Sequence, residues 1–284
     1  MKRTIIWTIG GLLLTLIACE QEKDTAEAEP GWQLVWSDEF EEEGLPDPER
    51  WSYDVGTACE KPAGCGWGNN ELQYYTESRE ENARVENGHL IIEAHQEPYK
   101  EDREYTSARL VSKGNGDWKY GKIEMRAMLP QGFGTWAAFW MLPTQPTHGG
   151  WPSSGEIDIL EYVGYAQDTV YGTVHTDAYN GMIGTQRGGE IHQKGVESDF
   201  HTYSIEWSED DISWYLDGQQ YFHFKNEKSG KAAWPFDHAF HLILNLAVGG
   251  HWGGSKGIDP DIWPQQYVID YVRVYQSSIQ KPSL

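Results

Sequence analysis

The sequence predicts an all-β protein, a sandwich of two antiparallel sheets. Short runs rich in branched and aromatic residues are broken by Gly, Asn, Asp or Pro, as strands separated by turns are. No long run shows the apolar spacing of an amphipathic helix. Residues 31–284 contain no repeat and no Pro/Ser-rich linker. A stretch of roughly 250 residues suits one large sandwich, so we expect a single domain there.

The chain begins with the features of an exported lipoprotein. Lys2 and Arg3 precede an apolar run from Ile5 to Ile17, which is too short to span a membrane. Cys19 follows a small residue, as in the lipobox of bacterial lipoproteins, so residues 1–18 are predicted to be a signal peptide cleaved before a lipid-bearing cysteine. An ordinary signal peptide with an accidental cysteine is the alternative.

Residues 19–30 predict a flexible linker. Beyond Cys19 this stretch is acidic and Ala-rich and lacks large apolar side chains, so it cannot bury a core. Acidic residues after a lipidated cysteine resemble the surface-export signal of Bacteroidetes lipoproteins. We therefore expect a protein anchored at a bacterial outer membrane or cell surface, which touches the membrane only through its lipid.

The charge of the chain excludes some classes of partner. Two of the 22 basic residues, Lys2 and Arg3, lie in the predicted signal, which leaves 20 against 44 acidic residues and a net charge of −24. Such a surface repels nucleic acid and anionic membranes. A neutral polymer is compatible with it, and we expect a monomer.

Strands can be assigned along the chain. Five runs have strand composition: His89–Ala94, Gly121–Leu129, Tyr203–Trp207, Ile212–Leu216 and Val268–Tyr275. Apolar and charged residues alternate in Gly121–Leu129, which is typical of a half-buried strand. Asp217-Gly218 predicts a hairpin turn. Leu242–Val248 is apolar except at Asn245, which predicts a strand buried on both faces; Asn245 is either a hydrogen-bonded core amide or a cleft residue.

Two cysteines lie six positions apart in a Gly-rich loop. In an exported chain the spacing of Cys59 and Cys65 predicts a local disulfide. A metal pair is disfavoured because the spacing is not Cys-x-x-Cys and no second ligand pair accompanies it. The disulfide would hold the loop that leads into Trp67 and Asn69–Thr76.

The stretch Gly155–Glu161, Gly-Glu-Ile-Asp-Ile-Leu-Glu, carries the clearest chemical signal. In a strand, Glu156 and Asp158 share one face, whereas strict alternation would turn Glu161 toward the core. A β-bulge at Leu160 would return Glu161 to the acidic face. An acidic face without function is the alternative, but like charges repel there and clustered carboxyls tend to mark functional sites.

The spacing of these acids suits glycoside hydrolysis. Glu156 and Glu161 would lie roughly 13 Å apart at Cα, at about 3.3 Å per strand step. Two Glu side chains leaning together could approach the separation of about 5–5.5 Å that retaining glycosidases use between nucleophile and acid/base. Asp158 between them would help to keep one neighbour protonated.

The run Glu156–Glu161 resembles the catalytic signature of glycoside hydrolase family 16, in the bulged form of its laminarinases. Four further stretches match the family: Trp36–Phe40, Asn69–Thr76, Tyr120–Arg126 and Trp136–Pro143. The resemblance extends from about Trp32 to Tyr275 and implies a β-jelly roll whose concave sheet forms a substrate cleft.

The resemblance also implies an activity, the retaining endo-hydrolysis of β-1,3-glucan without a catalytic cofactor. Glu156 would attack the anomeric carbon. Glu161 would protonate the leaving oxygen and later deprotonate water, while Asp158 orients and tunes Glu156.

Aromatic residues are the second chemical signal, with 14 Trp and 16 Tyr in the chain. Trp136 and Trp140 share one strand face on either side of Ala138, an arrangement that suits sugar stacking. Strand alternation alone does not decide whether these two residues lie in the core or in a cleft. The resemblance implies that both lie in the cleft. Trp151 and Trp252 lie in Gly/Pro-rich loops and are expected to be exposed and to touch substrate.

Several polar residues are further candidates. Asn70, Glu71 and Arg109 could hydrogen-bond sugar hydroxyls or could brace loops, and His175, one hairpin after the acids, could face the cleft or be structural. The resemblance also implies a structural calcium ion, held by the side chain of Glu39, the carbonyl of Gly88 and the carboxylate of Asp270, although no acidic calcium loop is present.

Two other functions remain open at this point. A hydrolase of the same fold could act on a galactan such as agarose or porphyran, because loops set the substrate. A non-catalytic glycan-binding lipoprotein is the other possibility, and the intact trio of Glu156, Asp158 and Glu161 argues against it, since a binder has no use for three clustered acids.

Overall fold

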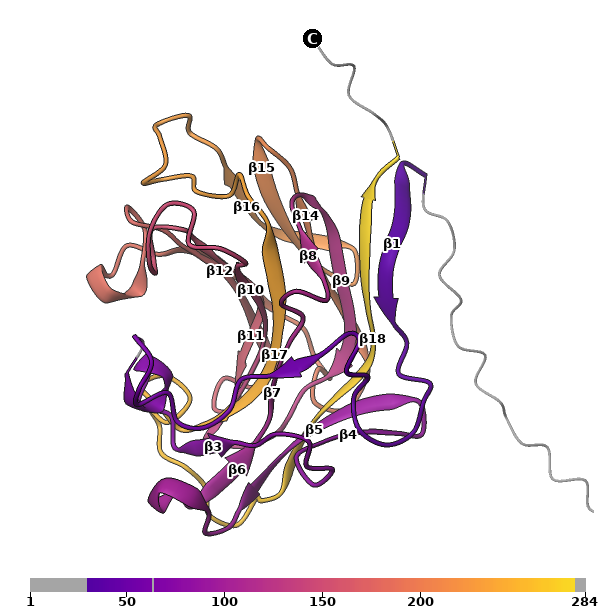
Figure 1. Cartoon of the computed structure of the whole chain (residues 1–284), viewed down its shortest axis with the longest axis vertical. Coiled ribbons are helices and arrows are strands. Elements are labelled where there is room, and N and C mark those ends of the chain that lie inside the picture. Colours follow the sequence, from indigo (N-terminus) through magenta and orange to yellow (C-terminus); the bar gives the residue numbers. More distant parts are fainter. Residues whose placement is uncertain (1–29, 63, 279–284) are drawn as a thin grey trace, which may run out of the picture.

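Two β-sheets stacked face to face form the protein in the computed structural model, which describes residues 30–62 and 64–278. Figure 1 shows β10, β11 and β12 on one side of the sandwich and β9 and β18 on the other. The predicted signal peptide, Cys19 and the linker up to residue 29 lie outside the described residues. Within the described part, no helix is long and apolar enough to cross a membrane.

The larger sheet has ten strands. Its order is β16-β15-β14-β9-β18-β5-β6-β3, and β1 and β4 pair with β18 and β5. The bounds are β16 (Gln219–Lys225), β15 (Asp211–Leu216), β14 (His201–Trp207), β9 (Gly121–Met128), β18 (Gln265–Ser277), β5 (His89–Gln96), β6 (Tyr105–Ser107), β3 (Gln73–Tyr75), β1 (Trp32–Asp38) and β4 (Ala83–Glu86).

The smaller sheet has eight strands in the order β13-β12-β11-β10-β17-β7-β2, with β8 paired to β17. The bounds are β13 (Arg187–His192), β12 (Thr169–His175), β11 (Glu156–Val163), β10 (Thr135–Pro143), β17 (Phe240–Val248), β7 (Arg109–Val111), β2 (Ser52–Tyr53) and β8 (Asp117–Trp118). Among the described residues, three short 3-10 helices lie in loops, at Cys65–Gly68, Lys100–Asp102 and Gly181–Ile183. β10, β11 and β12 are consecutive antiparallel neighbours, so their side chains meet on one face.

The predicted strands are present. The six predicted runs fall within or nearly coincide with β5, β9, β14, β15, β17 and β18, and Asp217-Gly218 forms the turn between β15 and β16. Both turn residues have positive φ, as a two-residue hairpin of the favoured kind requires. All nine residues of β17 are buried. One face of the strand packs in the core between the sheets, and on the other face Asn245 contacts Trp140 and Tyr75.

One expectation about burial is wrong. The charged face of β9 is not open to water, since Lys122 and Glu124 are each only 8% exposed. They form an ion pair of 2.8 Å, and the hydroxyl of Tyr271 donates a 2.9 Å hydrogen bond to Glu124. Tyr271 and Tyr275 of the neighbouring β18 cover Glu124 and Lys122, whereas Arg126, further along the same face, stays partly exposed.

The core between the sheets is rich in large aromatic side chains. Trp207, Trp214 and Tyr203 from the larger sheet and Phe139 and Tyr162 from the smaller one are among the largest fully or almost fully buried residues. Such side chains bridge the roughly 10 Å between packed sheets. The disulfide between Cys59 and Cys65 is present, as predicted, and it closes the loop before Trp67.

Candidate active site

The face of β11 that carries the acids owes its arrangement to a β-bulge. Asp158 pairs with Thr173 of β12, but Glu161 pairs with Tyr171. Two residues of β11 therefore oppose the single residue Gly172, and the register to β10 shifts at the same place. The extra residue reverses the alternation, which returns Glu161 to the face of Asp158.

The bulge consists of Ile159 and Leu160, which are 1% and 0% exposed. The predicted bulge is thus present, although two residues share it. Because both bulge side chains are apolar, burying them in the core costs little, and Glu161 remains partly accessible on the other side.

His175 lies beside the acids. Of the two roles that the sequence left open, facing the cleft or serving only the structure, this position fits the first. Its Nε2 is 3.4 Å from Oδ2 of Asp158 and 3.7 Å from Oε1 of Glu156. Burial disfavours the imidazolium, but contact with Asp158 and the charges of the neighbouring acids outweigh this and raise the pKa of His175 to about 10. A cation therefore stands between two carboxyl groups at neutral pH.

Glu156 is stabilised in its charged form by two neighbours. Burial and the charge of Asp158 raise its pKa to about 7, and the His175 cation and the indole N–H of Trp151 oppose that rise. The N–H of Trp151 donates a 2.8 Å hydrogen bond to Oε2 of Glu156. At neutral pH, a substantial share of Glu156 is therefore an ionised carboxylate.

The pKa of Glu161 is raised as well. Burial and the charge of Asp158 raise the pKa of Glu161 well above its ordinary value, and His175 opposes the rise. The hydroxyl of Thr173 is 3.4 Å from Oε2 of Glu161. Neighbouring carboxyl groups with raised pKa values can hold a proton on one partner while the other is ionised, which suits one as an acid and the other as a base or nucleophile.

Aromatic side chains flank these acids. Trp136 and Trp140 lie half-buried on one face of β10, with Ala137, Phe139 and Met141 fully buried on the other. The ring of Trp252 packs edge-on against Trp136 at 5.5 Å and against Tyr171 at 5.1 Å. Tyr171 was not predicted; its position on β12 opposite Glu161 follows only from the strand register.

Trp140 rests on a buried polar network. Its indole N–H donates a 2.7 Å hydrogen bond to Asn245, whose amide donates to the hydroxyl of Tyr75 at 3.1 Å. That hydroxyl lies 3.3 Å from Oε2 of Glu71. Asn245 is therefore a buried, hydrogen-bonded amide on the face of Trp140, and not part of the core between the two sheets.

Glu71 takes the bracing role among its two alternatives. It is 5% exposed, and its carboxylate also accepts hydrogen bonds from Gln73 and Asn69 at 2.7 and 3.2 Å. Burial raises the pKa of Glu71 despite these donors. With its oxygens engaged below Trp140, Glu71 supports the aromatic face and offers little surface to a sugar.

Arg109 is likewise a buried brace. Its guanidinium lies 4.3 Å from the ring of Trp67 and 4.7 Å from the ring of Trp140, and Nε is 3.1 Å from Asp54. At 7% exposure, it stacks behind Trp140 and adds positive charge below the acids. Asn70, by contrast, is exposed and its amide lies 2.8 Å from Nε2 of His251, one residue before Trp252.

Two groups of metal-ligating side chains occur among residues 30–62 and 64–278. The first, Glu156, Asp158 and His175, is the acid cluster itself. Nε2 of His175 faces Asp158 at 3.4 Å, and Nδ1 accepts a 3.2 Å hydrogen bond from the backbone N–H of Gly181, so both ring nitrogens are engaged within the chain.

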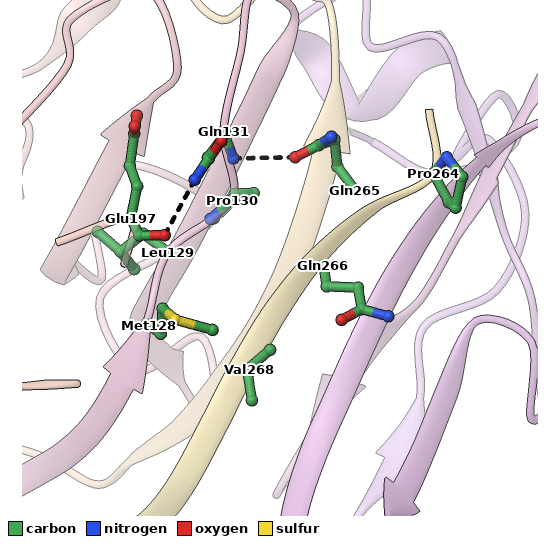
Figure 2. A pocket seen from close by; sticks show the side chains of 9 residues that line it. All are labelled: Met128, Leu129, Pro130, Gln131, Glu197, Pro264, Gln265, Gln266 and Val268. Atoms are coloured by element: carbon green, nitrogen blue, oxygen red, sulfur yellow. Dashed lines mark hydrogen bonds between the residues drawn. The ribbon is translucent and has the colours of Figure 1, made fainter. Parts of the chain in front are cut away.

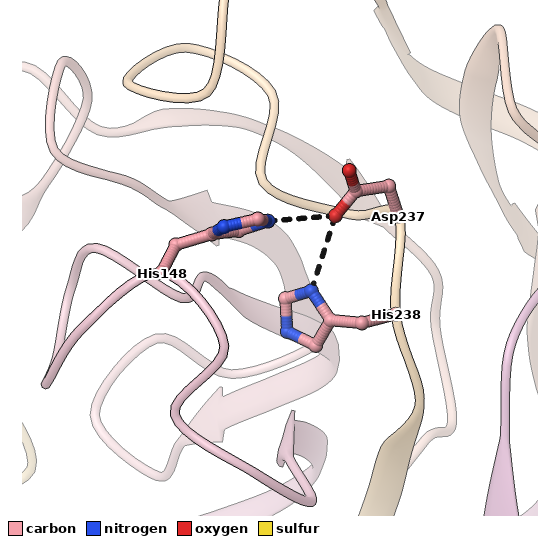
Figure 3. A group of neighbouring side chains, drawn as sticks. All are labelled: His148, Asp237 and His238. Carbon is pink, nitrogen blue, oxygen red and sulfur yellow. Dashed lines mark hydrogen bonds and ion pairs between the residues drawn. The ribbon is translucent and has the colours of Figure 1, made fainter.

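The second group is His148, Asp237 and His238, shown in Figure 3. Nε2 of His148 lies 2.7 Å and Nδ1 of His238 3.3 Å from the same oxygen of Asp237. The ammonium of Lys231, which can only donate, lies 3.3 Å from Nδ1 of His148, so Nε2 carries the proton toward Asp237. With both nitrogens so engaged, His148 serves the loop before Trp151 as a hydrogen-bonding residue.

The residues implied for calcium lie close together but are paired with arginines. Strand pairing of β18 with β1 and β5 brings their segments together. Glu39 binds the guanidinium of Arg273 at 2.8 and 3.0 Å, and Asp270 binds Arg126 at 2.6 Å. Both carboxylates are thus already neutralised, which does not favour a cation, and calcium at Glu39, Gly88 and Asp270 stays a prediction.

A hollow of about 220 Å³ lies elsewhere, beside the ends of β9 and β18 (Figure 2). It is bordered by Met128–Gln131 and Pro264–Gln266, and Gln131 spans it with hydrogen bonds to the carbonyl of Glu197 and to Gln265. None of the three acids or their aromatic neighbours lines it. The chemistry therefore belongs to the face of β10, β11 and β12.

Comparisons with known proteins agree with this site. Residues 70–273 match the family described as "Glycosyl hydrolases family 16". The chain is 55% identical over 284 residues to a beta-glucanase of Rhodothermus marinus, covering 97% of this chain and 95% of that protein. It is 42% identical to a glucan endo-1,3-beta-glucosidase of Cryptopygus antarcticus, with 87% and 93% covered. The structure matches that of the laminarinase from Rhodothermus marinus with a TM-score of 0.83 at 55% identity, covering 87% of this chain and 98% of that one.

Proposed function

Because this chain belongs to glycoside hydrolase family 16, we propose that it is a retaining endo-β-1,3-glucanase of the laminarinase type. The observation that carries the proposal is the bulged strand β11, which brings Glu156, Asp158 and Glu161 to one face, where burial and the charge of Asp158 raise the pKa values of both glutamates. The names of the relatives, a beta-glucanase and an endo-1,3-beta-glucosidase, support β-glucan as the substrate.

In the first step, Glu156 attacks the anomeric carbon. Its carboxylate is available near neutral pH because Trp151 and the His175 cation stabilise the charge. Glu161, whose pKa is raised well above its ordinary value by burial and the charge of Asp158, donates its proton to the leaving glycosidic oxygen. The C–O bond to the leaving group breaks as the ester bond to Glu156 forms, which leaves a glycosyl enzyme.

In the second step, Glu161 is the base. It has lost its proton to the leaving sugar and now takes one from water, which attacks the anomeric carbon and releases Glu156. Two inversions give net retention. Neither step needs a cofactor, and Asp158 contributes by holding His175 at 3.4 Å and by its charge between the two glutamates.

Substrate binding falls to the flanking aromatic side chains. Trp136 and Trp140 on β10 and the loop residues Trp151 and Trp252 present indole rings at the margins of the acid cluster. Sugar rings have apolar C–H faces that pack on aromatic rings. Neutral glucan also avoids the repulsion that a polyanionic substrate would meet from this acidic chain.

A lipid anchor at Cys19 is the second part of the proposal. The structural support is indirect: β1 begins at Trp32 in the larger sheet, whereas the acids lie in the smaller one. A tether before β1 would therefore leave the chain from the sheet opposite the acids. Metabolic labelling with a radioactive fatty acid tests the anchor, and Cys19→Ala should abolish the label.

The test of the enzymatic proposal is the release of reducing sugar by the full chain in mild detergent, with Glu156→Gln as the control. Laminarin, mixed-linkage β-glucan, agarose and porphyran are the four substrates. Release from laminarin that is lost in the control would support both the reaction and the nucleophile. Release from a galactan alone would overturn the substrate, and binding of laminarin without release from any substrate would favour a binding protein.

A further inference from the structure

The bulge of β11 is held by side chains from the opposite sheet. The indole N–H of Trp214, on β15, donates a 2.8 Å hydrogen bond to the carbonyl of Asp158. The hydroxyl of Tyr221, on β16, lies 3.5 Å from the carbonyl of Ile159. These two carbonyls stand at the point where the register of β11 slips, between the nucleophile side and the acid side of the site.

A missing side chain makes this contact possible. Gly172 is the single residue of β12 that opposes the bulge. A Cβ atom at Gly172 would lie 2.4 Å from Cδ1 of Trp214 and 2.7 Å from the hydroxyl of Tyr221. Any other residue would therefore push both side chains away from the bulge.

The neighbouring strand has the same property. Gly189 of β13 pairs with Gly172 and would, with a Cβ atom, meet Phe222 at 2.7 Å. Phe222 packs against Trp214 with ring centroids 4.7 Å apart. Two adjacent glycines thus leave an opening in the smaller sheet into which aromatic side chains of the larger sheet fit.

A second β-bulge, in β16, allows side chains of this strand to reach the smaller sheet. Trp214 pairs with Phe222 and Tyr215 with Gln220, so Tyr221 has no partner on β15. The extra residue lets Tyr221 and Phe222 both point toward the smaller sheet. Trp214 itself is completely buried, so its N–H has a fixed direction.

We propose that Trp214 and Tyr221 are positioning residues that hold the bulge of β11 through its carbonyls and so set the distance of Glu161 from Glu156. The proposal rests on the proposed function. Neither residue touches the substrate; each acts through the backbone before Glu161. Because a displacement of about 1 Å can cost about 100-fold in rate, loss of this support should impair the acid/base more than binding.

The test compares two substrates in the full-length enzyme. Laminarin needs the proton of Glu161 in the first step, whereas a dinitrophenyl β-laminaribioside, whose leaving group departs as a stable anion, does not. For Trp214→Phe we expect kcat/KM on laminarin to fall about 10- to 100-fold, with less than about a threefold fall on the dinitrophenyl substrate. Gly172→Ala should give the same pattern, and Tyr221→Phe a weaker one.

Matched controls separate this effect from simple loss of a buried group. The indole nitrogen of Trp207 and the hydroxyl of Tyr203 are buried in the same sheet without a hydrogen-bond partner among the described residues. Trp207→Phe and Tyr203→Phe therefore remove the same atoms without removing a bond to β11. Thermal denaturation of all variants shows how much of each is folded.

The possible results have distinct meanings. A Trp214→Phe enzyme that loses activity equally on both substrates, or that behaves as Trp207→Phe does, would overturn the positioning role. A wild-type enzyme that cleaves neither substrate would instead overturn the proposed function.

Discussion

The indole N–H of Trp151 donates a 2.8 Å hydrogen bond to Oε2 of Glu156, which joins a loop aromatic to a carboxylate of β11. Trp151 is 46% exposed, and its ring lies 5.9 Å from that of His175. The same side chain thus presents a ring to solvent and stabilises the charge on the nucleophile. Stacking and charge stabilisation can be separated by mutation.

Trp151→Phe keeps a ring but removes the N–H donor. The pKa of Glu156 should rise, because Trp151 opposes its elevation. Loss of a hydrogen bond to a charged group costs about 1.5–3 kcal/mol, so kcat should fall by roughly 10-fold or more with little change in KM. Trp151→Ala should raise KM as well. Steady-state kinetics on laminarin check both, and an equal rise in KM in the two variants would contradict the separation.

The pH dependence of kcat/KM should have an acid limb near pH 7, because Glu156 must be ionised to attack and its pKa is about 7. The His175 cation lowers that pKa. In His175→Gln the pKa of Glu156 therefore rises, and the acid limb should move to higher pH, with a greater loss of activity at pH 6 than at pH 8. An acid limb that stays in place would show that His175 does not act on Glu156.

The two glutamates should respond differently to amide substitution. Glu156→Gln removes the nucleophile, so activity should fall by roughly a thousandfold or more on any glucan substrate. Glu161→Gln should lose laminarin hydrolysis but retain most of kcat/KM on the dinitrophenyl laminaribioside, since that substrate needs no proton. The reverse pattern would exchange the two roles.

Arg109 should matter for stability. Lysine cannot stack on Trp67 and Trp140 as the planar guanidinium does, and it alters the pairing with Asp54. Arg109→Lys should lower the free energy of unfolding by about 1–3 kcal/mol, measured by urea denaturation. Arg187, which lies over Tyr179 at 4.5 Å but is exposed, offers a matched control, and Arg187→Lys should cost much less.

Deletion of Leu160 tests the bulge directly. Without the extra residue, Glu161 would follow Glu156 by four strand positions, so strict alternation would keep it on the acidic face with no bulge. The deletion should therefore retain part of the hydrolysis of laminarin, and circular dichroism should show whether the β-sheet persists. A folded deletion variant without any hydrolysis would show that the bulge does more than return Glu161 to the acidic face.

The sequence determined the strands and the acids because both depend on neighbouring residues. Runs of branched and aromatic residues broken by turn residues predicted β5, β14, β15 and β18 closely. One residue along a strand decides which face a side chain takes. The odd spacing of Glu156 and Glu161 predicted the bulge for the same reason. The half-buried state of β9 was predicted wrongly, because the aromatic cover of Lys122 and Glu124 comes from β18, far along the chain.

The tertiary structure alone decided how the acidic face is supported. Asn245, Glu71 and Arg109 brace Trp140 through contacts between β3, β7, β10 and β17, which no local pattern contains. The raised pKa values of Glu156 and Glu161 arise from burial and from the charge of Asp158, and His175 opposes them across a strand pair. Trp214 reaches Asp158 across 56 positions of sequence, through an opening left by glycine. Alternation along a strand is written in neighbouring residues, whereas charge, burial and support come from residues that only the folded chain brings together.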